Sequence, residues 1–317
     1  MSALGVVAPF WLDRPAGEAV DIAVEADRCG FDEVWVGEMA TFDAFALATA
    51  VSLRTERIGV KIGPVPLGVR SPVALGLGVA SVAELARRPA GLALGGSSPA
   101  IVSGWHDRPW DHAAGRMRET VAAVRTVLDG QKLSVAGKYL RSNGFRLREP
   151  VPVPITVAAF GPAMTRVAAE VADEVVLNLV PPAHVARTRE EIDGHARAAG
   201  RTPPRLAVWV PVALNPGEPT LRQLAAQASV YLRPPGYGEM FTALGYGELV
   251  AAARAGASRA SLTVPPSLVA DVGAIGTATE VRARLAAYHD AGADHVGLVP
   301  ATAEDPAGRT LLRELAP

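Results

Sequence analysis

Two side chains that could move protons stand just after short apolar runs of this chain. Glu38 follows the run 34–36, and His106 lies in a polar stretch beside Trp105. Histidine titrates near neutral pH and can give or take a proton, so we take His106 as a candidate proton carrier. His106 could instead cap an aromatic cluster, Trp105 could be an ordinary core aromatic, and Glu38 could cap a helix or form a surface salt bridge.

A proline-rich segment, Ile62-Gly63-Pro64-Val65-Pro66, follows another apolar run. Proline lacks the N–H that a parallel ladder needs, so the segment predicts either a rigid strand exit or a bulge. We favour a bulge that faces a ligand, formed by Gly63, Pro64 and Val65. A cis peptide bond here could precede Pro64 or Val65, and the sequence does not choose between them.

Small residues also follow three further apolar runs. Glycine lets the backbone approach a ligand, and serine hydroxyls can bind a polyol chain or a phosphate, although an ordinary turn is the alternative. Another segment runs from a predicted strand directly into a helix, where free N–H groups and the helix dipole favour an anion. The candidate ligand-binding residues are Gly95, Gly96, Ser97, Ser98, Ala158, Ala159, Phe160, Gly161 and Asn178.

Short β-branched runs alternate with longer Ala-rich amphipathic segments along most of the chain, which is typical of βα units. The predicted strands are 4–8, 33–36, 58–62, 91–94, 155–158, 174–177, 206–214 and 295–299. Eight such units favour a closed (β/α)₈ TIM barrel over an open doubly wound sheet. In that barrel the loops after the carboxyl ends of the strands carry the function, and every candidate residue above lies in or beside such a loop.

Two segments interrupt the alternation within what we predict to be a single domain, 1–317. Residues 131–149 predict a small hairpin outside the barrel. Residues 215–276 form a long insertion after the seventh strand, with at least two helical pieces. Its tyrosines, Tyr231, Tyr237 and Tyr246, could line a lid or could anchor the insertion to the barrel.

Composition excludes several other classes of protein. The formal net charge of −1 and the lack of a basic run argue against nucleic acid as a partner. No stretch approaches about 20 apolar residues, so we expect no membrane span, and the start has no signal-peptide pattern. The single cysteine, Cys29, excludes an internal disulfide and suits the cytoplasm. No His/Cys cluster has metal-ligand spacing, so we expect no metal site and a small-molecule substrate.

Several of these segments, in this order, resemble the luciferase-like oxidoreductase family. They are 30–38, 57–73, 93–99, 104–106, 154–162 and 172–175. The likeness is closest to the branch that uses the deazaflavin coenzyme F420. It implies a luciferase-like TIM barrel, a homodimer, and F420 as cofactor with FMN as the alternative.

The resemblance also implies roles for particular residues. The bulge at Gly63–Val65 corresponds to one with a cis peptide that supports the central ring of the cofactor, and Glu38 corresponds to an acidic residue near that ring. Many F420 enzymes carry a histidine after this acid, but this chain has Met39, which we place among the cofactor contacts. We therefore assign catalysis to His106, Glu38 and Trp105.

The leading interpretation is an F420-dependent oxidoreductase that transfers a hydride between the deazaflavin and an unidentified organic substrate. One alternative is an FMN-dependent luciferase-like monooxygenase. Another is a barrel that binds a flavin or deazaflavin without catalysis, which the residue at position 39 would allow.

Overall fold

A closed ring of eight parallel strands forms the centre of the computed structural model, which describes residues 3–38 and 40–317. The order around the ring is β1-β2-β3-β4-β7-β8-β9-β11, and β11 pairs with β1 to close it. The strands are β1 (Ala3–Ala8), β2 (Glu33–Val36), β3 (Gly59–Pro66), β4 (Ala90–Gly95), β7 (Ile155–Ala158), β8 (Glu174–Asn178), β9 (Arg205–Leu214) and β11 (His295–Pro300). The predicted TIM barrel is confirmed.

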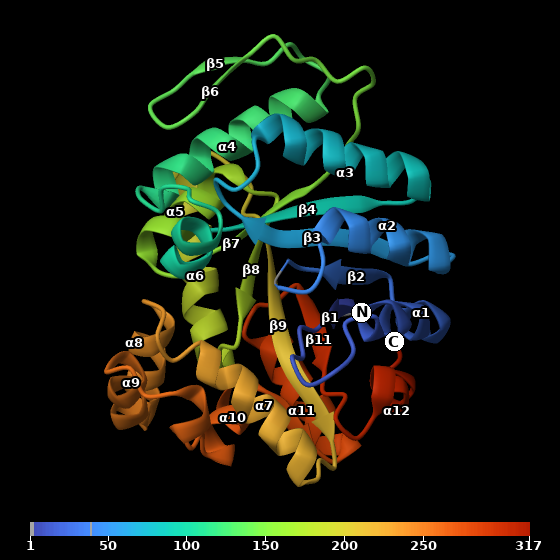
Figure 1. Cartoon of the computed structure of the whole chain (residues 1–317), viewed down its shortest axis with the longest axis vertical. Coiled ribbons are helices and arrows are strands. Elements are labelled where there is room, and N and C mark those ends of the chain that lie inside the picture. Colours follow the sequence, from blue (N-terminus) through green and yellow to red (C-terminus); the bar gives the residue numbers. More distant parts are fainter. Residues whose placement is uncertain (1–2, 39) are drawn as a thin grey trace.

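Helices surround this ring on all sides (Figure 1). They are α1 (Glu18–Cys29), α2 (Ala44–Arg54), α3 (Pro72–Ala86), α4 (Ala113–Leu128), α5 (Pro162–Val171), α6 (Pro182–Ala198), α11 (Ala278–Asp290) and α12 (Arg309–Glu314). Local chemistry sets several starts: Asp43 caps α2, Ser71 caps α3 ahead of Pro72, and Thr277 with Glu280 forms a capping box on α11. None of the described helices is both long and apolar enough to cross a membrane.

The two interrupting segments have defined structures. Residues 134–143 contain an antiparallel pair, β5 (Ser134–Ala136) and β6 (Arg141–Asn143), which projects beyond α4 in Figure 1. The segment after β9 holds α7 (Glu218–Val230), α8 (Tyr237–Phe241), α9 (Gly247–Arg254), α10 (Pro266–Val272), and the short β10 (Ala274–Gly276). β10 pairs with the last residues of β9, so the insertion returns to the mouth of the barrel.

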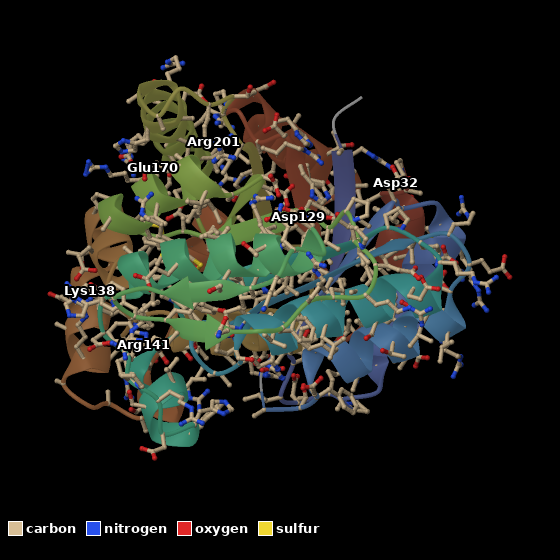
Figure 2. All side chains as sticks on the ribbon, turned by 90° about the horizontal axis from the view of Figure 1, so that it is seen from above. Asp32, Asp129, Lys138, Arg141, Glu170 and Arg201 are labelled. Carbon is tan, nitrogen blue, oxygen red and sulfur yellow. The ribbon has the colours of Figure 1, made fainter. Side chains whose placement is uncertain are left out.

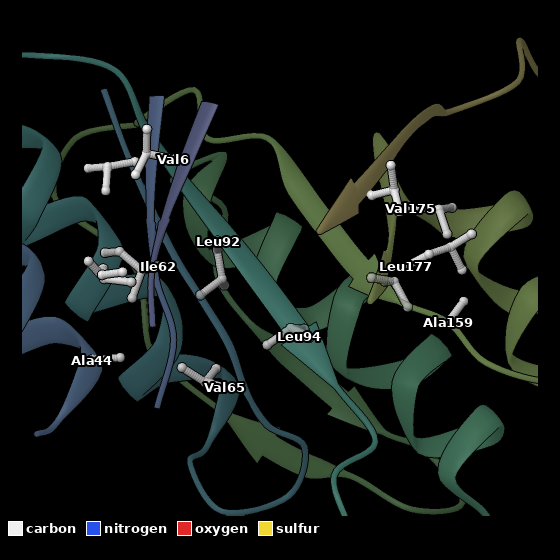
Figure 3. Close-up of a cluster of buried hydrophobic side chains, with 14 of the residues drawn as sticks. Val6, Ala44, Ile62, Val65, Leu92, Leu94, Ala159, Val175 and Leu177 are labelled. Carbon is white, nitrogen blue, oxygen red and sulfur yellow. The ribbon is translucent and has the colours of Figure 1, made fainter. Parts of the chain in front are cut away.

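Two hydrophobic cores hold the barrel. The larger lies between the strands and the helices, and Figure 3 shows Ile62, Leu92 and Leu94 among its side chains. The smaller fills the interior around Trp35 and Trp209, whose rings meet edge to face with centroids 5.3 Å apart. Successive residues along each strand point alternately outward, into the larger core, and inward, into the smaller one, as in any closed barrel.

Below the interior core, near the amino ends of the strands, lies a cluster of buried ionisable groups. The Lys61 ammonium pairs with Glu174, lies 3.3 Å from the Glu33 carboxylate, and sits 4.2 Å from the centre of the Trp35 ring. His295 Nδ1 lies 3.5 Å from Glu33 on the other side. This buried ion cluster, defined as Glu33, Lys61, Glu174 and His295, closes the end of the barrel away from the functional loops.

β3 differs from the prediction, which ended this strand at residue 62. The register shifts between Ile62 and Val65, and pairing then resumes from Val65 to Leu94. Pro64 is accommodated because the irregular step falls on Gly63 and Pro64, so the ladder passes over these two residues as a bulge.

Candidate active site

The carboxyl ends of β3, β4 and β7 form a floor of small residues at the mouth of the barrel. A Cβ built on Gly95 would lie 3.1 Å from the Pro64 side chain and 3.6 Å from that of Ala158. The three positions are therefore side by side, and the middle one has no side chain. A flat ligand could approach the backbone here because nothing projects from Gly95. We call Pro64, Gly95 and Ala158 the floor.

Gly63 makes the bulge beneath this floor possible. Its φ is +121°, and a Cβ there would come within 2.2 Å of the Ala93 carbonyl oxygen. Only glycine fits such a position. The cis peptide bond lies between Gly63 and Pro64, and the Val65 side chain is fully buried. Of the three predicted bulge residues, Pro64 alone contributes a side chain to the floor.

The turn from β7 into α5 leaves a helix N-terminus without a side-chain cap. Gly161 is the capping residue, with φ +78°, and Pro162 follows it. Ala159 is buried and anchors the turn, with its N–H on the Val176 carbonyl at 3.3 Å. The first N–H groups of a helix have no partner inside it, so this end can accept an anion, as the sequence predicts.

The loop after β4 folds back over the end of its own strand. Trp110 donates from Nε1 to the Gly96 carbonyl at 2.8 Å. Ser97 takes a left-handed conformation with φ +55° and is exposed, whereas Ser98 is half-buried. A π-helix over Ala100–Trp105 follows, an element often found at functional sites. Gly96, Ser97 and Ser98 thus follow the floor residue Gly95 directly, and Gly96 lies next to Met164 of α5.

His106 and Trp105 lie at the end of that π-helix and point into solvent. His106 caps the element through its own backbone N–H, bonded to Ser103, and its side chain is exposed. The Trp105 side chain is 57% exposed. Both belong to the loop that follows β4, but among the described residues no hydrogen bond or ring contact directs the imidazole toward the floor.

Glu38, the predicted acid of the second strand, is engaged on both of its oxygens. Arg70 donates two hydrogen bonds to it, at 2.6 and 2.7 Å, and Ala44 N–H donates a third at 3.0 Å. Arg70 also pairs with Asp43. The hydrogen bond from Arg70 to Glu38 raises the pKa of the guanidinium. These contacts are the salt bridge and helix cap considered as the alternative, so Glu38 here positions the start of α2.

An aromatic cluster on the opposite side of the floor was only partly foreseen. The Phe160 ring lies 5.1 Å from that of His184 and 4.3 Å from that of Tyr237, which in turn lies 4.9 Å from Tyr231. Asn178, at the end of β8, acts on both tyrosine hydroxyls, where burial raises the pKa and its amide lowers it. We call Phe160, His184, Tyr231 and Tyr237 the aromatic cluster.

Burial controls the protonation of this cluster. It lowers the pKa of His184 to about 4, assisted by the charge of Arg187. Burial also raises the pKa of Tyr231 and Tyr237, against the effect of the Asn178 amide. At neutral pH the whole cluster is therefore uncharged. The insertion tyrosines Tyr231 and Tyr237 both line the mouth and anchor the insertion.

The sequence analysis did not identify two residues of this region, Arg70 and His184. A signal for His184 was present, because it lies two residues after the pair Pro181-Pro182, and such a pair marks the junction between a strand and the next helix. Met39, the predicted cofactor contact, lies outside the described residues. Within those residues, no three His, Cys, Asp or Glu side chains come together as a metal site would require.

The fold and this mouth define a class of protein: a TIM barrel with a flat, small-residue floor beside an anion-binding helix end. The model of the luciferase-like monooxygenase family matches residues 4–295. The chain therefore belongs to that family, as the sequence motifs indicate.

Known relatives support this membership. The chain is 27% identical over 185 residues to a 5,10-methylenetetrahydromethanopterin reductase of Methanolobus tindarius, an alignment that covers 58% of this chain and only 56% of the reductase. It is 25% identical over 340 residues to a Mycobacterium tuberculosis protein provisionally described as a coenzyme F420-dependent oxidoreductase, covering 95% of this chain and 96% of that one.

A solved structure extends the likeness to the whole fold. The coenzyme F420-dependent tetrahydromethanopterin reductase of Methanopyrus kandleri superposes with a TM-score of 0.81 at 16% identity, over 99% of this chain and 98% of the other. The solved structure thus supports the fold, and the family model shows the luciferase-like family that the sequence motifs predict.

Proposed function

We propose that this chain is an F420-dependent oxidoreductase that transfers a hydride between the deazaflavin and an organic substrate. The observation that carries the proposal is the floor of Pro64, Gly95 and Ala158 beside the uncapped N-terminus of α5. A tricyclic ring needs a flat, side-chain-free surface, and its phosphate needs free N–H donors at one end. The relatives that use F420 support the same cofactor.

The residues present fit such a cofactor. Gly95 leaves open the place that a Cβ would fill between Pro64 and Ala158. Gly161 has no side chain to cap the helix, so the end remains available to a phosphate. Gly96, Ser97 and Ser98 border the path between them and offer backbone and hydroxyl groups to a ribityl chain.

When bound, F420 supplies a carbon of its central ring that can accept or give a hydride. The protein orients the ring on the floor and holds uncharged aromatic side chains over the adjoining wall. Neutral His184, Tyr231 and Tyr237 exclude water from that wall without adding a charge. Substrates without a net charge at the reacting end therefore match this side of the mouth best.

A direct binding experiment tests the proposal. Purified protein is titrated with F420 and, separately, with FMN, and the change in cofactor fluorescence is followed. We expect saturable binding of F420 and weaker binding of FMN. Binding of FMN alone, with no response to F420, would refute the proposal.

A matched pair of glycine variants locates the ligand on the floor. A Cβ on Gly96 would meet only the Met164 methyl, at 3.8 Å, so Gly96→Val should fold normally while projecting into the mouth. Gly194, on the exposed side of α6, has nothing within 4 Å and serves for the control Gly194→Val. We expect F420 affinity to fall at least about tenfold in the first variant only, which corresponds to about 1.4 kcal/mol.

The two alternatives predict other outcomes. An FMN-dependent monooxygenase, which the family name also allows, would bind FMN tightly and consume oxygen when reduced FMN is supplied. A barrel that only binds its cofactor would saturate with F420 but show no turnover across alcohols, aldehydes, enones and imines.

We also propose that the protein works as a homodimer in the cytoplasm. The packed helices α2 and α3 expose Leu53, Leu77 and Leu85, and a second copy would cover such side chains. Light scattering after gel filtration measures the mass directly. A mass of one chain at micromolar concentration would exclude the dimer, and cell fractionation would check the compartment.

A further inference from the structure

A groove rich in arginine opens beside the floor, between loops that follow β3 and β4. Its volume is about 290 Å³, and its walls come from the β3–α3 loop, the start of α4 and the hairpin. The charged or polar lining residues are Arg70, Ser71, Arg108, Arg116, Thr120 and Tyr139. All three ionised side chains of this set are cations, and no carboxylate lines the groove. We call it the arginine groove.

The three arginines differ in how far they are neutralised. Arg70 is held by Glu38 and Asp43 from behind, and Arg116 is held by Asp111. Arg108 takes part in none of the ion pairs found among residues 3–38 and 40–317. An anion entering the groove would therefore meet Arg108 as its principal partner.

The walls are built before any ligand arrives. The backbone of Arg108 is fixed on both sides, because its N–H donates to Val102 at 3.0 Å and its carbonyl accepts from Ser103 Oγ at 3.0 Å. The hairpin is pinned to α4 where Tyr139 N–H donates to Glu119 at 2.9 Å. The Arg116 guanidinium lies 5.4 Å from the centre of the Tyr139 ring. A preformed site spends little binding energy on ordering.

One polar residue in the wall is mostly buried. Thr120, on α4, is only 8% exposed and lines the groove, and its hydroxyl makes none of the side-chain hydrogen bonds found among the described residues. Beyond the rim, Lys138 lies 5.2 Å from the Tyr139 ring, and Figure 2 places Lys138 and Arg141 together at one edge of the molecule. Two further cations therefore lie on the hairpin that forms one wall of the groove.

The groove adjoins the proposed cofactor site directly. Leu67, in its wall, donates from N–H to the Gly95 carbonyl of the floor at 2.8 Å. The loop that carries Arg108 is tied to Gly96 by Trp110. The first turns of α4 line the groove, and α4 also packs against α5, at whose N-terminus we propose that the phosphate binds.

We propose that the arginine groove binds the carboxylates of the γ-glutamyl tail of F420. This inference rests on the proposed function. F420 continues beyond its phosphate into a chain of linked glutamates, each adding one carboxylate, whereas FMN ends at its phosphate. Arginine and hydroxyl donors along a narrow groove suit such a chain, since a guanidinium can bind a carboxylate through two hydrogen bonds. The groove would thereby help to select F420 over FMN.

The test compares cofactors that differ only in the tail. Dissociation constants are measured by fluorescence for F420-0, which has the phosphate but no glutamate, and for F420 with two or more glutamates. In the wild type we expect the long form to bind at least about fivefold tighter than F420-0. A factor of about five is the most that one exposed ion pair usually contributes. Raising the salt concentration should shrink this ratio, because exposed charges are screened.

Arg108→Gln should bring the ratio close to one while leaving the affinity for F420-0 unchanged. Arg148→Gln is the matched control, since that side chain is 95% exposed and lies outside the groove. Equal binding of the two forms to the wild type, or an equal loss for both in Arg108→Gln, would overturn the groove assignment and leave the proposed function standing. If no form of F420 binds, the proposed function fails, and this assignment fails with it.

Discussion

At the scale of single residues, the mouth of the barrel depends on positions that carry no side chain. Gly63 turns the chain at the bulge, and Gly95 and Gly96 keep the surface above it open. A side chain at these positions would either collide with the backbone or fill the space that a ligand needs. The need for glycine is therefore steric, and substitutions can test it without knowledge of the ligand.

Gly63→Ala should destabilise the fold strongly. The new Cβ would come within 2.2 Å of the Ala93 carbonyl oxygen at a φ of +121°. Backbone strain and overpacking each cost about 1–3 kcal/mol, so we expect a loss of about 3 kcal/mol in the free energy of unfolding by urea. Gly194→Ala, in an open helical position, should instead be neutral or slightly stabilising. Equal effects of the two substitutions would contradict this account.

Glu38 and Arg70 should behave as one structural unit. Two hydrogen bonds between charged groups join them, and both side chains are mostly buried. A double-mutant cycle of Glu38→Gln and Arg70→Gln should give a coupling of about 1–3 kcal/mol in unfolding free energy. If Glu38 acted only as a catalytic acid, the coupling would be near zero and the loss would appear in turnover alone.

Sequence reasoning identified one member of this pair and missed the other. Glu38 was visible because it closely follows a predicted strand, whereas Arg70 lies 32 residues later and reaches it only in the folded barrel. The same limit applies to His184, whose stacking partner Phe160 is on the preceding βα unit. Local patterns show which residues reach the mouth, but which side chains meet there depends on tertiary packing.

At the scale of elements, the agreement is much closer. The predicted strands 33–36 and 155–158 coincide with β2 and β7, and the remaining barrel strands differ by a few residues. Buried parallel strands and amphipathic helices each have a strong periodic signature, which explains this agreement. The bulge in β3 lengthened one strand beyond its prediction, because irregular pairing has no period to detect.

The long insertion is the element whose arrangement was least predictable. Its first helices dock on the barrel through Tyr231 and Tyr237, which pack with Phe160 and His184. Aromatic pairs of this geometry contribute about 0.5–1.5 kcal/mol beyond their buried area. The aromatic cluster therefore holds the insertion against the barrel beside the mouth.

Tyr237→Ala should loosen the insertion without unfolding the barrel. We expect faster hydrogen exchange in 231–254, while β1, β4 and β11 keep their protection. Tyr246→Phe is the control, because its hydroxyl bonds Asp271 at 2.6 Å within the insertion and takes no part in the aromatic cluster. Unchanged exchange in 231–254 would show that other contacts hold the insertion.

At the scale of the whole molecule, the barrel interior is divided along its axis. Small residues form the floor at one end, tryptophans fill the middle, and the buried ion cluster closes the other end. A charge in an apolar strand was a signal present in the sequence, since Lys61 stands between Val60 and Ile62. A buried lysine requires partners, but sequence could not say that Glu33 and Glu174 supply them.

Two members of the buried ion cluster respond to acid in opposite ways. Burial raises the pKa of Glu33, with Glu174 acting in the same direction and Lys61 against it. The folded state therefore holds a proton on Glu33 at a pH where the unfolded chain has lost it. Protonation of Glu33 therefore increases the free energy of unfolding as pH falls. This gain partly offsets the loss of stability that the neighbouring His295 causes in acid.

His295 should make the fold lose stability in weak acid. Burial lowers its pKa to about 4, with Lys61, Arg205 and His289 acting in the same direction and Glu174 against it. Below an ordinary pKa of about 6.5 the unfolded chain takes up a proton that the folded chain refuses, so the unfolding free energy falls between pH 6.5 and 4. The shift sets an upper limit of about 3 kcal/mol. Urea unfolding of the wild type and of His295→Gln, at half-unit steps of pH, measures this contribution. The variant should show a shallower fall over that window, and parallel curves would mean that His295 titrates in the folded protein as it does in the unfolded chain.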